Sequence, residues 1–345
     1  MDKTVKIEIL IYLIIIVFCL VCTILAYYIL FQKELLCVGG IPAGSCGSVK
    51  PYYCLDGNLV KDISKCGCPL NSKIENKDCF SNYETSPRQI LLPYVLRGKK
   101  SFVNFTIYQG VYDYILDIPR YIEADENPTL LDFRLKNVNN SFQREFLFPL
   151  VAEIQNITTN REDQVRIAIS LVQNIPYGFS KKFSIFLKIN KIDYQRYAYE
   201  VLYENQGVCG EKAGLLVFLL RELGYGTSFV YYKPENHEAV GIKCPLKRSI
   251  PGSNYCFIET TGPSIISDDK TEFVGIESLS LNPEMIVTSE GKSFGNNRYE
   301  YKDADRLTKI RESMKKYGVI NFLQTIQFRD IKKKYGLINF NSYEF

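Results

Sequence analysis

Six of the eleven cysteines of this chain lie within a stretch of 43 residues. The stretch is rich in Gly, Ser, Pro, Asn and Asp and has almost no apolar periodicity, so burial alone cannot offset the entropy lost on ordering it. Segments of this kind are usually held by disulfides. The six cysteines are Cys37, Cys46, Cys54, Cys66, Cys68 and Cys79. Three disulfides are therefore predicted here, with all fifteen pairings open.

A zinc site is the alternative use of these cysteines. Structural zinc sites usually carry pairs of cysteines two to four residues apart. The closest pair here is Cys66-Gly-Cys68, with a single residue between the two thiols. The spacing favours disulfides, and we expect no metal and no cofactor. Zinc held by a reduced, cytoplasmic segment stays as the alternative.

Residues 9–31 form an uncharged, apolar run of 23 residues. As a helix, such a run is about 34 Å long, enough to cross a bilayer, and it is longer than the apolar part of a cleaved signal peptide. We expect a single-pass anchor in the cell membrane, with the lipid bilayer as a partner. Disulfides persist in oxidising compartments, so the N-terminus is expected in the cytoplasm and the rest of the chain outside it.

Four further cysteines and three asparagines bear on this expectation. Cys244 and Cys256 flank an eleven-residue loop between two strand-like runs; they are either disulfide-bonded or two separate buried thiols. Cys19 and Cys22 lie in the apolar run. Glycosylation sequons begin at Asn104, Asn139 and Asn156. If these assignments hold, Cys209 is the one thiol outside the membrane without a partner.

Four segments are expected along the chain. They are residues 1–34 (stub and anchor), 35–82 (disulfide-rich segment), 83–300 (main domain) and 301–345 (basic helical tail). Within the main domain, helices are predicted across 141–175 and over 209–223, followed by three strands. A net charge of +4 is too small to indicate a nucleic-acid partner.

Cys209 lies between two glycines at the start of the apolar helical pattern "CGEKAGLLVFLLREL". The positive end of a helix dipole stabilises a thiolate. Gly207 and Gly210 allow the backbone to turn sharply and to direct N–H groups at a developing oxyanion. A lone cysteine is, however, more often a buried, inert thiol.

Two further residues complete a possible catalytic set. His237 is the only histidine of the chain, and its imidazole could exchange protons with the thiol. Glu259 ends the next strand-like run, where a carboxylate could orient that imidazole. Each residue alone is more often structural. Their order within 51 residues, Cys then His then acid, favours a catalytic interpretation.

The segments "NQGVCGEKAGLLVFLLRELGYGTSFV", "NHEAVGIK" and "CFIETTGP", with "VRIAISLVQNIPYG" upstream, resemble the transglutaminase-like superfamily, especially its membrane-anchored archaeal members. The segment with "SKCGCP" is similar to a module of archaeal surface proteins. The resemblance implies an α+β fold with a papain-like core, in which a central helix packs on an antiparallel sheet. It also implies Cys209 as nucleophile, His237 as base and acid, and Glu259 as the orienting acid. Gln206 is a further oxyanion candidate, as in papain-like enzymes.

The expected function is that of a cell-surface cysteine enzyme acting on the amide bonds of a protein or peptide substrate in the cell envelope. Hydrolysis and acyl transfer share a thioester on Cys209, and the sequence does not choose between them. The alternative is an inactive binding or scaffold protein of the same fold. The family position of Glu259 is usually Asp, and the chain lacks the Trp that eukaryotic transglutaminases use.

Overall fold

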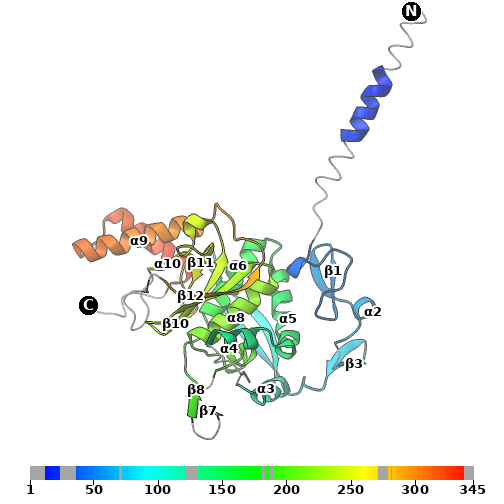
Figure 1. Cartoon of the computed structure of the whole chain (residues 1–345). Helices are drawn as coiled ribbons and strands as arrows, with labels where there is room; N and C mark the ends of the chain where they lie inside the picture. The colour runs from blue at the N-terminus through cyan, green and yellow to red at the C-terminus, as the bar shows by residue number, and fades with distance from the viewer. Residues whose placement is uncertain are drawn as a thin grey trace, which may run out of the picture.

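Helices and antiparallel sheets alternate along the chain (Figure 1). The computed structural model describes residues 12–23, 36–69, 72–120, 130–180, 183–186, 190–193, 195–270, 279–280 and 282–337. The helices are α2 (Ile63–Cys66), α3 (Gln109–Leu116), α4 (Leu130–Val138), α5 (Ser141–Ile157), α6 (Arg161–Gln173), α7 (Ala198–Glu204), α8 (Cys209–Glu222), α9 (Tyr299–Tyr317) and α10 (Phe322–Tyr335), with 3-10 turns at Val38–Gly40 and Leu246–Arg248.

The strands of the described residues pair only in antiparallel fashion. They are β1 (Tyr52–Leu55), β2 (Asn58–Lys61), β3 (Ser72–Glu75), β4 (Asp78–Ser81), β5 (Pro87–Leu96), β6 (Lys99–Tyr108), β7 (Phe183–Phe186), β8 (Asn190–Asp193), β9 (Gly226–Tyr232), β10 (His237–Lys243), β11 (Tyr255–Ile258) and β12 (Glu284–Glu290). One sheet has four strands in the order β11-β10-β9-β12, and the other strands form two-stranded hairpins.

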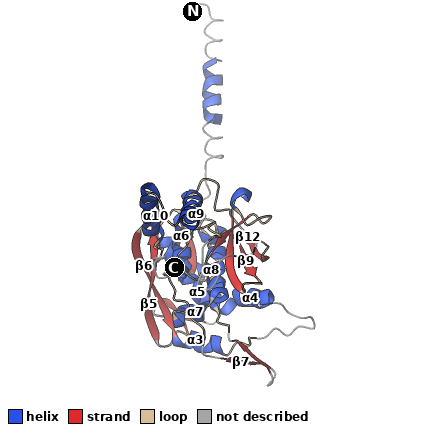
Figure 2. Ribbon diagram, turned by 90° about the vertical axis from the view of Figure 1, so that its left-hand side faces the viewer, coloured by secondary structure: helices blue, strands red, loops and turns tan. Residues whose placement is uncertain are grey.

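Helices lie between two of these sheets (Figure 2). On one side β5 and β6 form a long hairpin, whose turn residues Arg97 and Gly98 have φ values of 50° and 78°, as a tight hairpin turn requires. On the other side lies the four-stranded sheet. Helix α6 packs on β5, α8 packs on β9 and β10, and the two helices pack on each other. The core is therefore built around α8, which has twelve of its fourteen residues buried.

The cysteine-rich segment is held by three disulfides, as predicted. They are Cys37–Cys54, Cys46–Cys66 and Cys68–Cys79. The fourth disulfide, Cys244–Cys256, closes the loop between β10 and β11. The three free cysteines are Cys19, Cys22 and Cys209. This accounts for all eleven cysteines and confirms that the chain is disulfide-bonded.

Several local predictions are also confirmed. The region 141–175 contains α5 and α6, the helix at 209–223 is α8, and the three strands after it are β9, β10 and β11. In the tail, α9 and α10 each end at a left-handed glycine, Gly318 and Gly336. The tail joins the main body through ion pairs, among them Arg166 of α6 with Glu300 of α9.

The predicted fold class is wrong. The described residues form a mixed α/β structure with small antiparallel sheets, and nothing in them identifies a transglutaminase-like core. The error has a physical source: short motifs fix the residues around one helix and two strands, while the sheet organisation depends on pairings between distant segments. The four-stranded sheet illustrates this, because β12 (Glu284–Glu290) pairs with β9 (Gly226–Tyr232), more than fifty residues earlier in the chain.

The predicted membrane anchor, and with it the cell-membrane location, is also wrong. Among the residues that the structure describes, no helix is both long enough and apolar enough for a bilayer. Residues 12–23 are helical, and at about 1.5 Å per residue they make about 18 Å, against about 30 Å of hydrocarbon. The other residues of 9–31 lie outside the described ranges.

Replacing Cys244 and Cys256 together with Ala should lower the free energy of unfolding by about 2–3 kcal/mol, because the unfolded chain regains the freedom of the closed loop. Urea unfolding under non-reducing conditions measures this change. The matched control replaces the free and exposed pair Cys19 and Cys22 with Ala and should leave the unfolding midpoint unchanged. Equal midpoints for both double variants would contradict the structural role of the β10–β11 disulfide.

Candidate active site

The N-terminus of α8 is fixed by a buried carboxylate. Glu211, which is 2 % exposed, accepts a hydrogen bond from the backbone N–H of Val208 (2.9 Å). It also accepts two from Arg196, through the backbone N–H and Nη1, each at 2.8 Å. A negative charge at this position complements the positive end of the helix dipole. Cys209, the first residue of α8 and partly exposed, is thereby held in a defined place.

His237 and Glu259 meet at one edge of the four-stranded sheet. His237 opens β10 and Glu259 directly follows β11, and in an antiparallel pair the start of one strand lies beside the end of its neighbour. His237 Nε2 lies 2.9 Å from Glu259 Oε2, and both side chains are almost fully buried. Cys209 also acts on this imidazole and raises its pKa. Since Nε2 faces the carboxylate, Nδ1 is the nitrogen left for the thiol.

The imidazole of His237 is biased towards its protonated form. Burial alone lowers its pKa, but the hydrogen bonds with Cys209 and Glu259, together with their negative charges, outweigh burial and raise the pKa from 6.5 to about 10. At neutral pH the ring therefore carries a proton between the thiol and the carboxylate. A protonated imidazole in this position can give its proton to a group that reacts beside it.

Glu259 is held through both its carboxylate and its backbone carbonyl. Glu259 Oε1 accepts hydrogen bonds from the backbone N–H (2.7 Å) and hydroxyl (2.6 Å) of Thr261. The backbone carbonyl of Glu259 accepts one from Gln173 of α6 (2.9 Å). The hydroxyl of Thr260 reaches the carbonyl oxygen of Cys209 (3.3 Å), which ties the end of β11 to the start of α8. The extra methylene of Glu relative to Asp is accommodated, because the carboxylate reaches His237.

The two predicted oxyanion residues lie on either side of Cys209. Gly210 is the second residue of α8, so its N–H belongs to the first turn, where backbone donors have no acceptor within the helix. The side chain of Gln206 lies against Gly178, where an added Cβ would come within 2.7 Å of Gln206 Oε1. Gly178 donates a backbone hydrogen bond to Gly207 (3.3 Å). The assignment of an oxyanion role to either residue stays a prediction.

Sequence reasoning missed three charged residues around α8. Arg134 of α4 forms a buried, two-pronged ion pair with Glu238 (2.8 and 2.7 Å). Lys212 is fully buried and donates to the carbonyl of Ile175 (2.6 Å); burial lowers its pKa to about 8. Glu238 is visible beside His237 in the sequence, but nothing local marks Arg134, which lies 104 residues away, as its partner.

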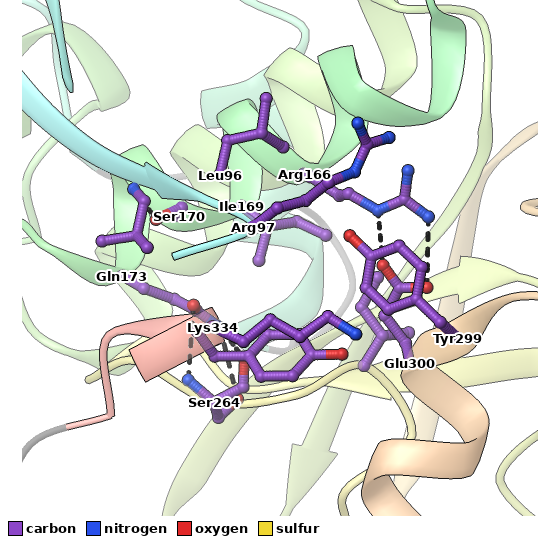
Figure 3. A pocket seen from close by; sticks show the side chains of 13 residues that line it. Leu96, Arg97, Arg166, Ile169, Ser170, Gln173, Ser264, Tyr299, Glu300 and Lys334 are labelled. Atoms are coloured by element: carbon purple, nitrogen blue, oxygen red, sulfur yellow. Dashed lines mark hydrogen bonds and ion pairs between the residues drawn. The ribbon is translucent and has the colours of Figure 1, made fainter. Parts of the chain in front are cut away.

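A pocket lined by both polar and apolar side chains lies between α6 and the C-terminal helices (Figure 3). Figure 3 shows Arg166 facing Glu300, and Gln173 hydrogen-bonded to Ser264. Cys209, His237 and Glu259 do not line it. Gln173 connects the two regions, because the same amide group also donates to Glu259. The pocket therefore lies where the C-terminal helices contact the main domain, and Gln173 links it to Glu259.

The predicted glycosylation asparagines lie on the surface. Asn104 is on β6, Asn139 follows α4 and Asn156 is near the end of α5, and all three are exposed. The Asn139 side-chain oxygen accepts a hydrogen bond from Arg221 (2.7 Å). Their modification stays a prediction.

Comparison with models of known protein families gives no match for this chain, and comparison with curated proteins gives none. The geometry of the site is therefore the basis for its chemistry. A thiol at a helix N-terminus, an imidazolium beside it and a buried carboxylate behind the ring can together carry out nucleophilic attack and proton transfer.

Replacing Glu259 with Gln should lower the pKa of His237, because it removes the charge that stabilises the imidazolium. The chain has one histidine, so a single imidazole Cε1–H signal reports the titration by NMR. We expect a midpoint near pH 10 for the wild type and lower midpoints for Glu259→Gln and Cys209→Ala. Thr288→Val, on β12, serves as a control that leaves the midpoint unchanged.

The same shift predicts how stability depends on pH. The folded-state pKa of His237 lies above its ordinary value of 6.5, so the protonated ring contributes its full stabilisation below pH 6.5 and loses it as the pH rises towards 10. This loss should disappear in His237→Gln, measured as the difference in unfolding free energy between the two proteins across that range. An NMR titration midpoint of His237 near pH 6.5 in the wild type would contradict the interaction of this imidazole with Cys209 and Glu259.

Proposed function

We propose that the protein is a cysteine enzyme that cleaves or transfers acyl groups from amide bonds of peptides or proteins through a thioester on Cys209. The observation that carries the proposal is the buried pair of His237 and Glu259, whose side chains lie 2.9 Å apart, together with Cys209, which raises the pKa of the same imidazole. It is supported by the order of these residues, which is that of the transglutaminase-like motifs noted in the sequence.

In the first half-reaction, the Cys209 thiolate attacks the amide carbonyl carbon. A C–S bond forms, and the electron pair of the C=O bond moves to oxygen. As the tetrahedral intermediate collapses, the C–N bond breaks and the His237 imidazolium gives its proton to the leaving nitrogen. An amine or ammonia departs and a thioester remains. The high pKa of His237 suits this step, because the ring already holds the proton that the leaving group needs.

In the second half-reaction, the imidazole of His237 must accept a proton instead of donating one. The thioester has no negative charge on sulfur, so one of the interactions that raise the pKa of His237 is lost. The ring can then accept a proton from an attacking water or amine, while Glu259 stabilises the new imidazolium. Water gives hydrolysis and an amine gives acyl transfer, and the two products differ only in this acceptor. One histidine can therefore serve both steps without another base.

The Cys209→Ala variant should lose all turnover, because the nucleophile is absent. The assay is best made in a Cys19→Ala/Cys22→Ala background, where Cys209 is the one free thiol. Release of ammonia or free amine from casein-derived peptides measures turnover, and mass spectrometry of the trapped protein identifies the acyl group on Cys209. The matched control is the Cys19→Ala/Cys22→Ala protein itself, which should be fully active. Turnover retained without Cys209 would falsify the proposal.

A binding protein with an inactive site predicts a different pattern of thiol reactivity. If His237 assists the thiol, iodoacetamide should alkylate Cys209 faster in the wild type than in His237→Gln at the same pH. Equal alkylation rates in the two proteins, with no acyl adduct from any peptide, would favour the scaffold.

A further inference from the structure

The guanidinium of Arg134 lies against the backbone of the residue that follows Cys209. An alanine Cβ built on Gly210 would lie 2.0 Å from Arg134 Nη2 and 2.2 Å from Glu238 Oε1. These separations are far below any possible contact, so position 210 must be a glycine for the ion pair to occupy its place. The pair is thus packed directly on the first turn of α8.

Part of this guanidinium is left without a partner. Nε and Nη2 both bond to Glu238, and Nη1 is buried with no hydrogen-bond partner among the described residues. Arg134 is only 3 % exposed. Buried polar groups are nearly always satisfied, and leaving one unpaired is costly. A buried cation with two free N–H bonds is therefore a site prepared for a negative group.

The negative charges that act on Arg134 are those of Glu238, Cys209 and Glu211. Burial lowers the pKa of Arg134, but these charges and the hydrogen bonds to Glu238 outweigh it and raise the pKa above its ordinary value. The guanidinium therefore keeps its positive charge beside the first turn of α8. Glu238 binds Nε and Nη2, which leaves the buried Nη1 as a donor without a partner among the described residues.

We infer that Arg134 is a catalytic residue whose Nη1 donates a hydrogen bond to the substrate oxygen that becomes negative when Cys209 attacks. The inference rests on the proposed function and specifies how its intermediate is stabilised. Attack forms the C–S bond and places an electron pair on the carbonyl oxygen; Nη1 and the Gly210 N–H would share that oxyanion. Preorganised donors shielded from water are the most effective stabilisers of such charge.

Two reagents separate this role from a purely structural one. p-Nitrophenyl acetate acylates a thiolate through a tetrahedral oxyanion and releases p-nitrophenolate, whereas iodoacetamide reacts by displacement of iodide without an oxyanion. Arg134→Lys keeps a positive charge opposite Glu238 but removes the guanidinium fork. We expect its acylation burst to be about 100-fold slower than that of the wild type, with alkylation of Cys209 close to the wild-type rate.

A second variant leaves Arg134 in the chain. Gly210→Ala keeps the backbone N–H but forces the guanidinium away, so the same selective loss of acylation is expected. The matched control is Gly214→Ala on the same helix, where an added Cβ meets only Val138 Cγ2 at 4.0 Å; its burst should equal that of the wild type. Circular dichroism confirms that each variant is folded.

Three outcomes would overturn the inference. Equal loss of acylation and alkylation would mean that Arg134 acts on the thiolate and not on the oxyanion. Unchanged acylation in folded Arg134→Lys and Gly210→Ala would make the ion pair purely structural. Absence of any burst in the wild type would remove the proposed function itself, and with it this role of Arg134. The wild-type burst, compared with Cys209→Ala, therefore distinguishes the two failures.

Discussion

The burial of α8 is the constraint on which the rest of the structure depends. A helix that is apolar on nearly every side must be enclosed by other elements, and here α4, α6 and α7 lie against it together with β9 and β10. Its N-terminus emerges just far enough for Cys209 to remain partly exposed. Because the helix cannot shift without opening the core, its first turn is a rigid platform for chemistry.

The same burial explains the unusual charges at that end of the helix. Although Cys209 is partly exposed, the charged side chains of Glu211 and Lys212 in the same turn are buried and cannot be solvated by water. Glu211 is instead paired with the fully buried Arg196 (2.8 Å), and Lys212 is satisfied by a backbone carbonyl. Isolated buried charges are expensive, and removing one partner is worse than never having the pair. Glu211, Arg196 and Lys212 fix the position of Cys209. The packing of the apolar part of α8 offsets the free energy that burying these charges costs.

The parts of the fold that could be predicted from the sequence are those fixed by local rules. Gly318 and Gly336 end helices because few other residues tolerate positive φ. The closely spaced cysteines of the N-terminal segment indicated disulfides in the same local way. The role of Glu211 could also have been predicted, because a carboxylate at the third position of a helix is a known capping signal. His237 and Glu259, both selected from the sequence, lie 2.9 Å apart, and the catalytic role of these two residues with Cys209 stays a prediction.

What could not be predicted depends on contacts between distant residues. The pairing of β9 with β12, of Arg134 with Glu238 and of Arg166 with Glu300 leaves no trace in local periodicity. The apolar run at 9–31 shows the opposite failure, because composition alone indicated a span that the described helix at 12–23 is too short to make. In each case, a local pattern was compatible with several three-dimensional contexts.

The register between α8 and β10 links the two halves of the site. Consecutive residues of the helix act on consecutive residues of the strand: Cys209 raises the pKa of His237, and Gly210 lies against Glu238. Each strand residue in turn brings a buried partner from elsewhere, Glu259 behind His237 and Arg134 beside Glu238. A slip of one residue between helix and strand would therefore separate Cys209 from His237 and Arg134 from Gly210 at the same time. Cys209, His237 and Arg134 are positioned by one packing contact, so a change that weakens this contact should displace all three together.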